Sequence, residues 1–116
     1  MSDQLLDFSG LVAVVTGGSR GLGREMSLAM AARGADIVIT SRKAEACEAV
    51  AKEIEAMGRQ AMAYGCHVGR WEEVRAMIDA VYDRFGKIDI LINNAGMSPL
   101  YDKLSDVPEA LFDKVI

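Results

Sequence analysis

Metal-binding and disulfide-forming residues are scarce in this chain of 116 residues, which has two cysteines and one histidine. The histidine, His67, follows Cys66 directly, and no other residues complete the spacing of a zinc site, so we expect no bound metal. Two cysteines are also too few for the disulfide framework of a small secreted domain. This scarcity favours a reducing compartment, and we expect the protein in the cytoplasm.

Positive charge and long apolar runs are lacking too. Lys and Arg number 13 against 17 Asp and Glu, a net charge of −4, whereas a surface that binds nucleic acid is normally basic. No stretch approaches the run of about 20 apolar residues that a membrane helix needs. The opening segment, MSDQLLDFSG, has no basic part followed by a long apolar part, so we expect no signal peptide. We therefore expect neither nucleic acid nor a membrane as a partner.

What the chain does contain is an alternation of apolar strands and amphipathic helices. Short apolar runs predict strands at 11–16, at 36–40, within 60–68 and at 88–93. Helical patterns, each followed by a glycine, predict helices at 22–33, 43–57 and 71–85, and a further helix begins after Asp106. Strands that alternate with helices in this way form a parallel sheet with helices on both faces. The sequence therefore predicts one α/β domain.

Two of the predicted helices carry a defined apolar stripe. In helix 43–57 the stripe consists of Cys47, Val50, Ile54 and Met57. In helix 71–85 it consists of Trp71, Val74, Ile78, Val81 and Phe85, which step by three and four residues. A stripe with this period packs against the core of a domain.

The first predicted strand runs into a glycine-rich turn, TGGSRGLG, at residues 16–23. In a doubly wound sheet this turn lies at the carboxyl end of the strand, where ligands bind. Gly17 permits a tight turn, Gly21 lets the backbone approach a phosphate, and Gly23 lets the helix pack closely on the sheet. The helix that follows offers free N–H groups and a partial positive charge, which suit a pyrophosphate. A glycine-rich turn without a ligand remains an alternative at this point, whereas the spacing excludes a P-loop.

The spacing T-G-x-x-x-G-x-G, together with NNAG at 93–96 directly after the fourth strand, resembles the short-chain dehydrogenase/reductase family. The resemblance runs from Gly10 to Ile116. It implies a Rossmann-type, doubly wound parallel sheet with strand order 3-2-1-4, of which residues 1–116 form the N-terminal part of a single NAD(P)-binding domain. It also implies a set of residues that contact the cofactor: Thr16, Gly17, Ser19, Arg20, Gly21, Leu22, Gly23, Asn94, Ala95 and Gly96. Asn93 is expected to be a buried hydrogen-bonding residue rather than a ligand contact.

The end of the second strand, TSRK at 40–43, bears on which nicotinamide cofactor is bound. An acidic residue there binds the ribose 2′-hydroxyl of NAD, and a basic residue accommodates the 2′-phosphate of NADP. Ser41 stands at the acid position and Arg42 follows it, while Arg20 in the glycine turn is a second cation. A guanidinium can form two hydrogen bonds to a phosphate, so we expect NADP, with NAD less favoured. The alternative for Arg42 is that it simply begins a solvated helix.

The residues after the third strand depart from the family pattern. The family often has Asp-Val there, with the Asp beside the adenine amino group, whereas this chain has His67 and Val68. A neutral histidine can accept or donate a hydrogen bond, or stack on the base. A loop histidine that faces solvent is an equal alternative.

The family transfers hydride between the nicotinamide and a small-molecule carbonyl or alcohol, using a Tyr and a Lys four residues later. Tyr64, Tyr82 and Tyr101 are followed at that distance by Val, Gly and Ser. The family pattern therefore implies an NADP-dependent oxidoreductase, homo-oligomeric when complete, represented here by a truncated cofactor-binding half that contains no catalytic residue and is inactive alone. A truncated product that binds a nucleotide or a partner without catalysis is the alternative. A Rossmann-like methyltransferase or a flavodoxin-like domain is less favoured, because NNAG has no role in either.

Overall fold

The computed structural model describes residues 7–67 and 69–94. Its strands are β1 (Val12–Thr16), β2 (Asp36–Ser41), β3 (Ala61–Gly65) and β4 (Ile90–Asn93), and its helices are α2 (Gly21–Ala32), α3 (Ala44–Ala56) and α4 (Trp71–Phe85). The four predicted strands and the first three predicted helices are therefore confirmed, with ends that differ by one or two residues at most places. The helix expected after Asp106 lies outside the described residues.

The strands form one parallel sheet with the order β3-β2-β1-β4, which confirms the predicted topology. Thr16 lies opposite both Thr40 and Asn93, and Ser41 lies opposite Gly65. The carboxyl ends of all four strands therefore meet at one edge of the sheet. Every described turn that leaves a strand, including the glycine turn after β1, begins at this carboxyl edge.

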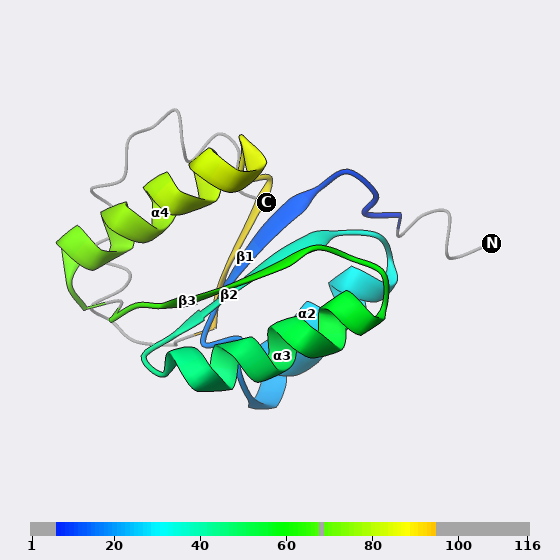
Figure 1. Cartoon of the computed structure of the whole chain (residues 1–116), viewed down its shortest axis with the longest axis horizontal. Coiled ribbons are helices and arrows are strands. Elements are labelled where there is room, and N and C mark those ends of the chain that lie inside the picture. Colours follow the sequence, from blue (N-terminus) through cyan, green and yellow to red (C-terminus); the bar gives the residue numbers. More distant parts are fainter. Residues whose placement is uncertain (1–6, 68, 95–116) are drawn as a thin grey trace.

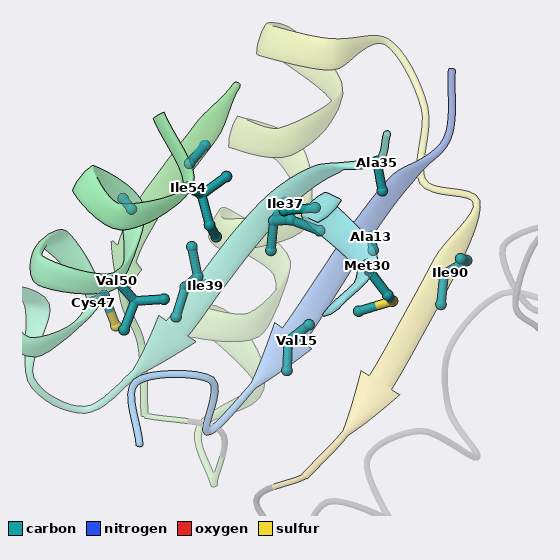
Figure 2. Close-up of a cluster of buried hydrophobic side chains, with 13 residues drawn as sticks. Ala13, Val15, Met30, Ala35, Ile37, Ile39, Cys47, Val50, Ile54 and Ile90 are labelled. Atoms are coloured by element: carbon teal, nitrogen blue, oxygen red, sulfur yellow. The ribbon is translucent and has the colours of Figure 1, made fainter. Parts of the chain in front are cut away.

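Helices cover both faces of the sheet, with α2 and α3 on one side and α4 on the other (Figure 1). Each face has its own cluster of buried apolar side chains, because successive residues of a strand point to opposite faces. Figure 2 shows the cluster under α2 and α3, which contains Ile39 of β2 with Val50 and Ile54 of α3, and Val15 of β1 with Met30 of α2. All five residues of β1 are buried, as expected of a central strand covered on both sides.

The cluster under α4 takes the alternate strand residues, Val12, Val14 and Val38. From α4 it takes the buried side chains of Val74 and Val81, as the stripe predicted, and also Met77. The predicted stripe residues Trp71, Ile78 and Phe85 are half-buried and pack against the margin of this cluster. The buried face of α4 is therefore centred closer to Met77 than the sequence pattern indicated.

The prediction that Met57 belongs to the buried stripe of α3 is wrong. Met57 remains 42% exposed, because α3 ends at Ala56 and Met57 is its C-terminal cap. The buried face of α3 instead consists of Cys47, Val50, Ala51 and Ile54. Within the described part of the chain, no helix combines the length and the apolar character needed to cross a bilayer.

Candidate cofactor-binding site

The glycine turn is tied to the end of the neighbouring strand. The backbone N–H of Gly17 donates to the carbonyl of Thr40 over 2.7 Å, and that of Gly18 approaches the same oxygen at 3.4 Å. The chain then passes Ser19, which is half-buried, and enters α2 after Arg20. The turn is thereby held at the carboxyl edge of the sheet, between the ends of β1 and β2.

Two positions in the turn require glycine for different reasons. Gly21 has φ +57°, a conformation that side chains disfavour, and a Cβ there would meet no atom within 4 Å. A Cβ on Gly23 would lie 2.2 Å from the carbonyl oxygen of Gly17, which is closer than atoms can approach. Gly23 therefore permits the close packing of α2, and Gly21 leaves open space in front of the helix.

The N-terminus of α2 lacks the groups that normally neutralise it. The N-cap residue, Arg20, makes no side-chain capping bond, and the first turn contains no acidic residue. By contrast, α3 has Glu45 and α4 has Glu72 and Glu73 in their first turns. The first amides of a helix have no partner within it and carry partial positive charge. None of the three described helices has a side-chain cap at its N-terminus, and α2 is the one among them with no acidic residue in its first turn.

The end of β4 closes the turn from the other side. The backbone N–H of Asn94 donates to the Thr16 hydroxyl over 3.0 Å, and its side-chain amide donates to the carbonyl of Gly17 over 3.2 Å. The Thr16 hydroxyl in turn faces the carbonyl of Ile92 at 3.2 Å and the side-chain oxygen of Asn93 at 3.5 Å. The structure therefore brings together Thr16, Gly17, Gly23 and Asn94. The predicted contacts Ala95 and Gly96 lie outside the described residues.

The carboxyl edge carries two exposed arginines, Arg42 after β2 and Arg20 in the glycine turn, and the last residue of β2 is not an acid. Ser41 is half-buried, and its hydroxyl accepts the N–H of Lys43 over 3.3 Å and lies 3.0 Å from the thiol of Cys47. Arg42 and Arg20 are exposed, and neither forms an ion pair among the described residues. Leu22, also predicted to contact the cofactor, is 67% exposed beside this edge.

The chain after β3 stays close to the end of β2. The N–H of Cys66 donates to the carbonyl of Ser41 over 2.8 Å. One residue later, the N–H of His67 donates to the carboxylate of Glu73 over 2.9 Å, and the ring Nδ1 of His67 accepts the N–H of Gly69 over 3.0 Å. His67 is half-buried, and Val68 lies outside the described residues.

The two thiols near this edge are poor nucleophiles. Cys47 and Cys66 are both free and buried, and burial raises the pKa of each thiol. Among the described residues, no group of three or more His, Cys, Asp or Glu side chains could hold a metal ion. The carboxyl edge therefore offers amides, hydroxyls, guanidinium groups and the imidazole of His67, but no reactive thiolate and no metal cluster among the described residues.

Three features of the structure had no signal in the sequence. The bond from Asn94 to Gly17 and the bond from His67 to Glu73 join positions that no local pattern connects. The third is an open hollow of about 650 Å³ at the opposite, amino edge of the sheet, whose lining includes Arg33, Gly34 and Arg59. It is separated from the glycine turn by the length of the strands.

A parallel sheet of this order, with a glycine turn leading to an uncapped helix N-terminus, defines a dinucleotide-binding fold of the Rossmann type. The sequence model of the short chain dehydrogenase family matches residues 11–116, and the chain belongs to that family.

Curated relatives and solved structures agree with this assignment. The chain is 32% identical to a tropinone reductase-like 3 protein of Erythroxylum coca over 93% of its length and 42% of that protein. It is 42% identical to a 3-oxoacyl-[acyl-carrier-protein] reductase of Synechocystis over 75% of its length and 36% of that protein. A hydroxysteroid dehydrogenase from Escherichia coli superposes with a TM-score of 0.78 at 37% identity, over 84% of this chain and 41% of that one.

Among the solved relatives, one is complexed with NADPH and another has bound NAD⁺. L-sorbose reductase from Gluconobacter frateurii, complexed with NADPH and L-sorbose, has a TM-score of 0.75 at 35% identity, covering 79% of this chain and 35% of that one. A xylitol dehydrogenase with bound NAD⁺ has a TM-score of 0.74 at 37% identity, covering 78% of this chain and 35% of that one. The chain spans roughly two fifths of the length of the curated relatives it matches, 42% of one and 36% of the other.

Proposed function

We propose that this chain is the cofactor-binding part of an NADP-dependent oxidoreductase of the short-chain dehydrogenase/reductase type. When bound, the nicotinamide cofactor supplies hydride to a carbonyl or accepts it from an alcohol. The observation that carries the proposal is the carboxyl edge itself, where α2 begins after the exposed Arg20 with no acid in its first turn, and β2 ends at Ser41 with the exposed Arg42 after it. The other site residues remain predictions on the family pattern.

The residues present fit a dinucleotide. Open space in front of Gly21 and the free first amides of α2 suit a pyrophosphate, which needs close backbone approach and N–H donors. Asn94 holds the Gly17 carbonyl, so the turn is shaped before any ligand arrives. A preformed turn lowers the entropy cost of binding.

The charges at the end of β2 favour NADP over NAD. An acid at the end of β2 would repel a 2′-phosphate, and Ser41 stands there instead. Arg42 is exposed and free to form paired hydrogen bonds with the phosphate oxygens. Hydrogen bonds to charged groups contribute about 1.5–3 kcal/mol, which corresponds to about tenfold or more in affinity.

The test is a calorimetric titration of the full-length protein with NADPH and with NADH. We expect NADPH to bind at least about tenfold more tightly, and Arg42→Ala to weaken NADPH by a similar factor while changing NADH by less than about twofold. Arg75→Ala is the matched control, because Arg75 is an exposed arginine of α4 with no ion pair among the described residues. Equal affinity for the two cofactors, or equal weakening of both by Arg42→Ala, would refute the preference for NADP.

Catalysis, oligomeric state and location are proposals about the whole protein. The Tyr and Lys pair of the family is not found among these 116 residues, and a nucleotide-binding or partner-binding product without catalysis is the competing function. The intact mass of the protein from its natural source, followed by NADPH oxidation with a panel of carbonyl compounds, separates the two. We also propose a homo-oligomer, on the family pattern, and the cytoplasm, where the two free cysteines would stay reduced.

A further inference from the structure

His67 lies where the adenine half of a bound dinucleotide must extend. The pyrophosphate belongs at the N-terminus of α2, after β1, and the ribose belongs over the end of β2. In the sheet the next strand outward is β3, so the base continues over the end of β3. The N–H of Cys66 is still bonded to the carbonyl of Ser41, which places His67 one residue beyond the last bond between these two segments.

The tautomer of His67 is set by its neighbours. The ring Nδ1 lies 3.0 Å from the backbone nitrogen of Gly69, which can only donate, so Nδ1 must be the unprotonated acceptor. In a neutral imidazole the proton then resides on Nε2. The Nε2 atom has no hydrogen-bond partner among the described residues, so its N–H is available to a ligand.

Two further contacts hold the ring and its backbone in place. A Cβ on Gly69 would lie 2.8 Å from Cε1 and 3.1 Å from Nδ1 of His67, so a side chain at residue 69 would push the ring out of this position. The carboxylate of Glu73 accepts the backbone N–H of His67 over 2.9 Å and is itself paired with Arg70 at 3.3 Å. One contact thus holds the ring through Nδ1, and the other holds the backbone of His67, at the end of β3.

We propose that His67 is a specificity-determining residue that reads the base of the cofactor as a hydrogen-bond donor, through Nε2–H. An acidic residue at this position can only accept, so it selects the amino group of adenine and repels a carbonyl oxygen. A donor instead selects an acceptor, which adenine offers on its ring nitrogens and hypoxanthine offers on O6 as well. The protein therefore does not reject hypoxanthine in place of adenine.

This inference rests on the proposed binding of an NADP-type dinucleotide, and its experiment distinguishes the two. The full-length protein is titrated with NADPH and with its analogue in which hypoxanthine replaces adenine. We expect the two dissociation constants to agree within about threefold, because the donor has an acceptor in each case. In His67→Asp, we expect a preference of about tenfold or more for adenine, since one good hydrogen bond is lost and a repulsion is gained.

Nuclear magnetic resonance of the imidazole nitrogens provides a readout that needs no catalysis. The His67 signals, assigned by their loss in His67→Asn, should show Nδ1 as the unprotonated nitrogen and Nε2 as the protonated one, and NADPH should shift Nε2. Gly69→Ala is the second variant, because it keeps the histidine but pushes the ring from its acceptor position. We expect it to alter both nitrogen signals and to weaken NADPH binding by about threefold or more while leaving the fold intact.

The possible results distinguish a failure of the proposed function from a failure of this inference alone. If neither NADPH nor NADH binds, the proposed function and this inference both fail. If NADPH binds but wild-type protein rejects the hypoxanthine analogue by about tenfold or more, or the Nε2 signal does not respond to NADPH, the inference alone is overturned. A protonated Nδ1 in the free protein would overturn it without any ligand.

Discussion

The side-chain amide of Asn94 donates a hydrogen bond of 3.2 Å to the carbonyl oxygen of Gly17, a residue 77 positions earlier in the chain. The same oxygen is the atom that a Cβ on Gly23 would strike at 2.2 Å. The end of β4, the turn after β1 and the first turn of α2 therefore meet at one carbonyl group. A change in any of these segments reaches the space in front of Gly21, where the pyrophosphate is expected.

The role of that space can be separated from backbone strain. Gly21 and Gly58 both have positive φ, +57° and +88°, and a Cβ on either would meet no atom within 4 Å. Alanine at either position should therefore lose a similar stability, about 1–2 kcal/mol, from the left-handed conformation alone. Only Gly21 lies on the glycine turn, so only Gly21→Ala should weaken NADPH binding, by about tenfold or more, because its methyl group enters the phosphate space.

Urea denaturation and NADPH titration of the two variants check this prediction. Similar midpoints with unequal dissociation constants are the expected result. If Gly58→Ala weakened NADPH binding as much as Gly21→Ala, the effect would come from general destabilisation and the role assigned to Gly21 would be wrong.

Most of the fold could be predicted because it depends on local patterns. Runs such as LVAVV and DIVIT supply the two central strands, whose residues are mostly buried, and amphipathic helices between them leave a parallel sheet as the consistent arrangement. The strand order followed from the resemblance of two motifs, at 16–23 and 93–96, and the structure confirms it. The glycine turn was placed correctly for the same reason.

The parts that sequence could not supply depend on tertiary geometry. From periodicity alone, the sequence predicted that Met57 belongs to the buried stripe of α3. The helix ends at Ala56, however, and Met57 stays partly exposed. The orientation of His67 depends on Gly69 and Glu73, and nothing in the sequence indicated that a glycine two residues away would supply the donor for Nδ1. The sequence therefore left open whether His67 accepts, donates or faces solvent, and the contact between Nδ1 and the N–H of Gly69 supports our proposal that it donates.

The contact between Glu73 and the backbone of His67 makes stability depend on pH. The N–H of His67, with a further contribution from Arg70, holds the pKa of the Glu73 carboxyl below its ordinary value. A carboxyl whose pKa is lower in the folded protein stabilises it fully above the unfolded pKa, and this stabilisation is lost as pH falls through the folded pKa. We therefore expect Glu73→Gln to reduce the loss of stability below about pH 4.5.

Thermal denaturation of the wild type and the variant between about pH 3 and 7 measures this difference. Glu72→Gln is the matched control, because the neighbouring Glu72 makes no side-chain hydrogen bond or ion pair among the described residues. The prediction is contradicted if Glu72→Gln changes the acid limb of the stability profile as much as Glu73→Gln does.

Thr16 and Thr40 offer a comparison at nearly identical positions. They lie directly opposite each other on β1 and β2 and are 3% and 0% exposed. The Thr16 hydroxyl accepts the N–H of Asn94 and faces the carbonyl of Ile92, so it joins β1 to the end of β4. The Thr40 hydroxyl makes no ordinary hydrogen bond among the described residues, and its polar neighbour is the thiol of Cys66, a weak partner.

Valine has the shape of threonine without the hydroxyl, so the two substitutions should have opposite results. Thr16→Val removes the acceptor of Asn94 and should cost about 1 kcal/mol or more, because a part-buried N–H is left unpaired. Thr40→Val removes a buried hydroxyl whose polar neighbour is only the weakly bonding thiol of Cys66, so it should be neutral or stabilise the protein by up to about 1 kcal/mol. Urea denaturation midpoints of the two variants give the answer. If both variants lost the same stability, the hydrogen bonds of the Thr16 hydroxyl would not be what joins β1 to the end of β4 in solution. The contact between the glycine turn and the end of β4 would then depend on other interactions.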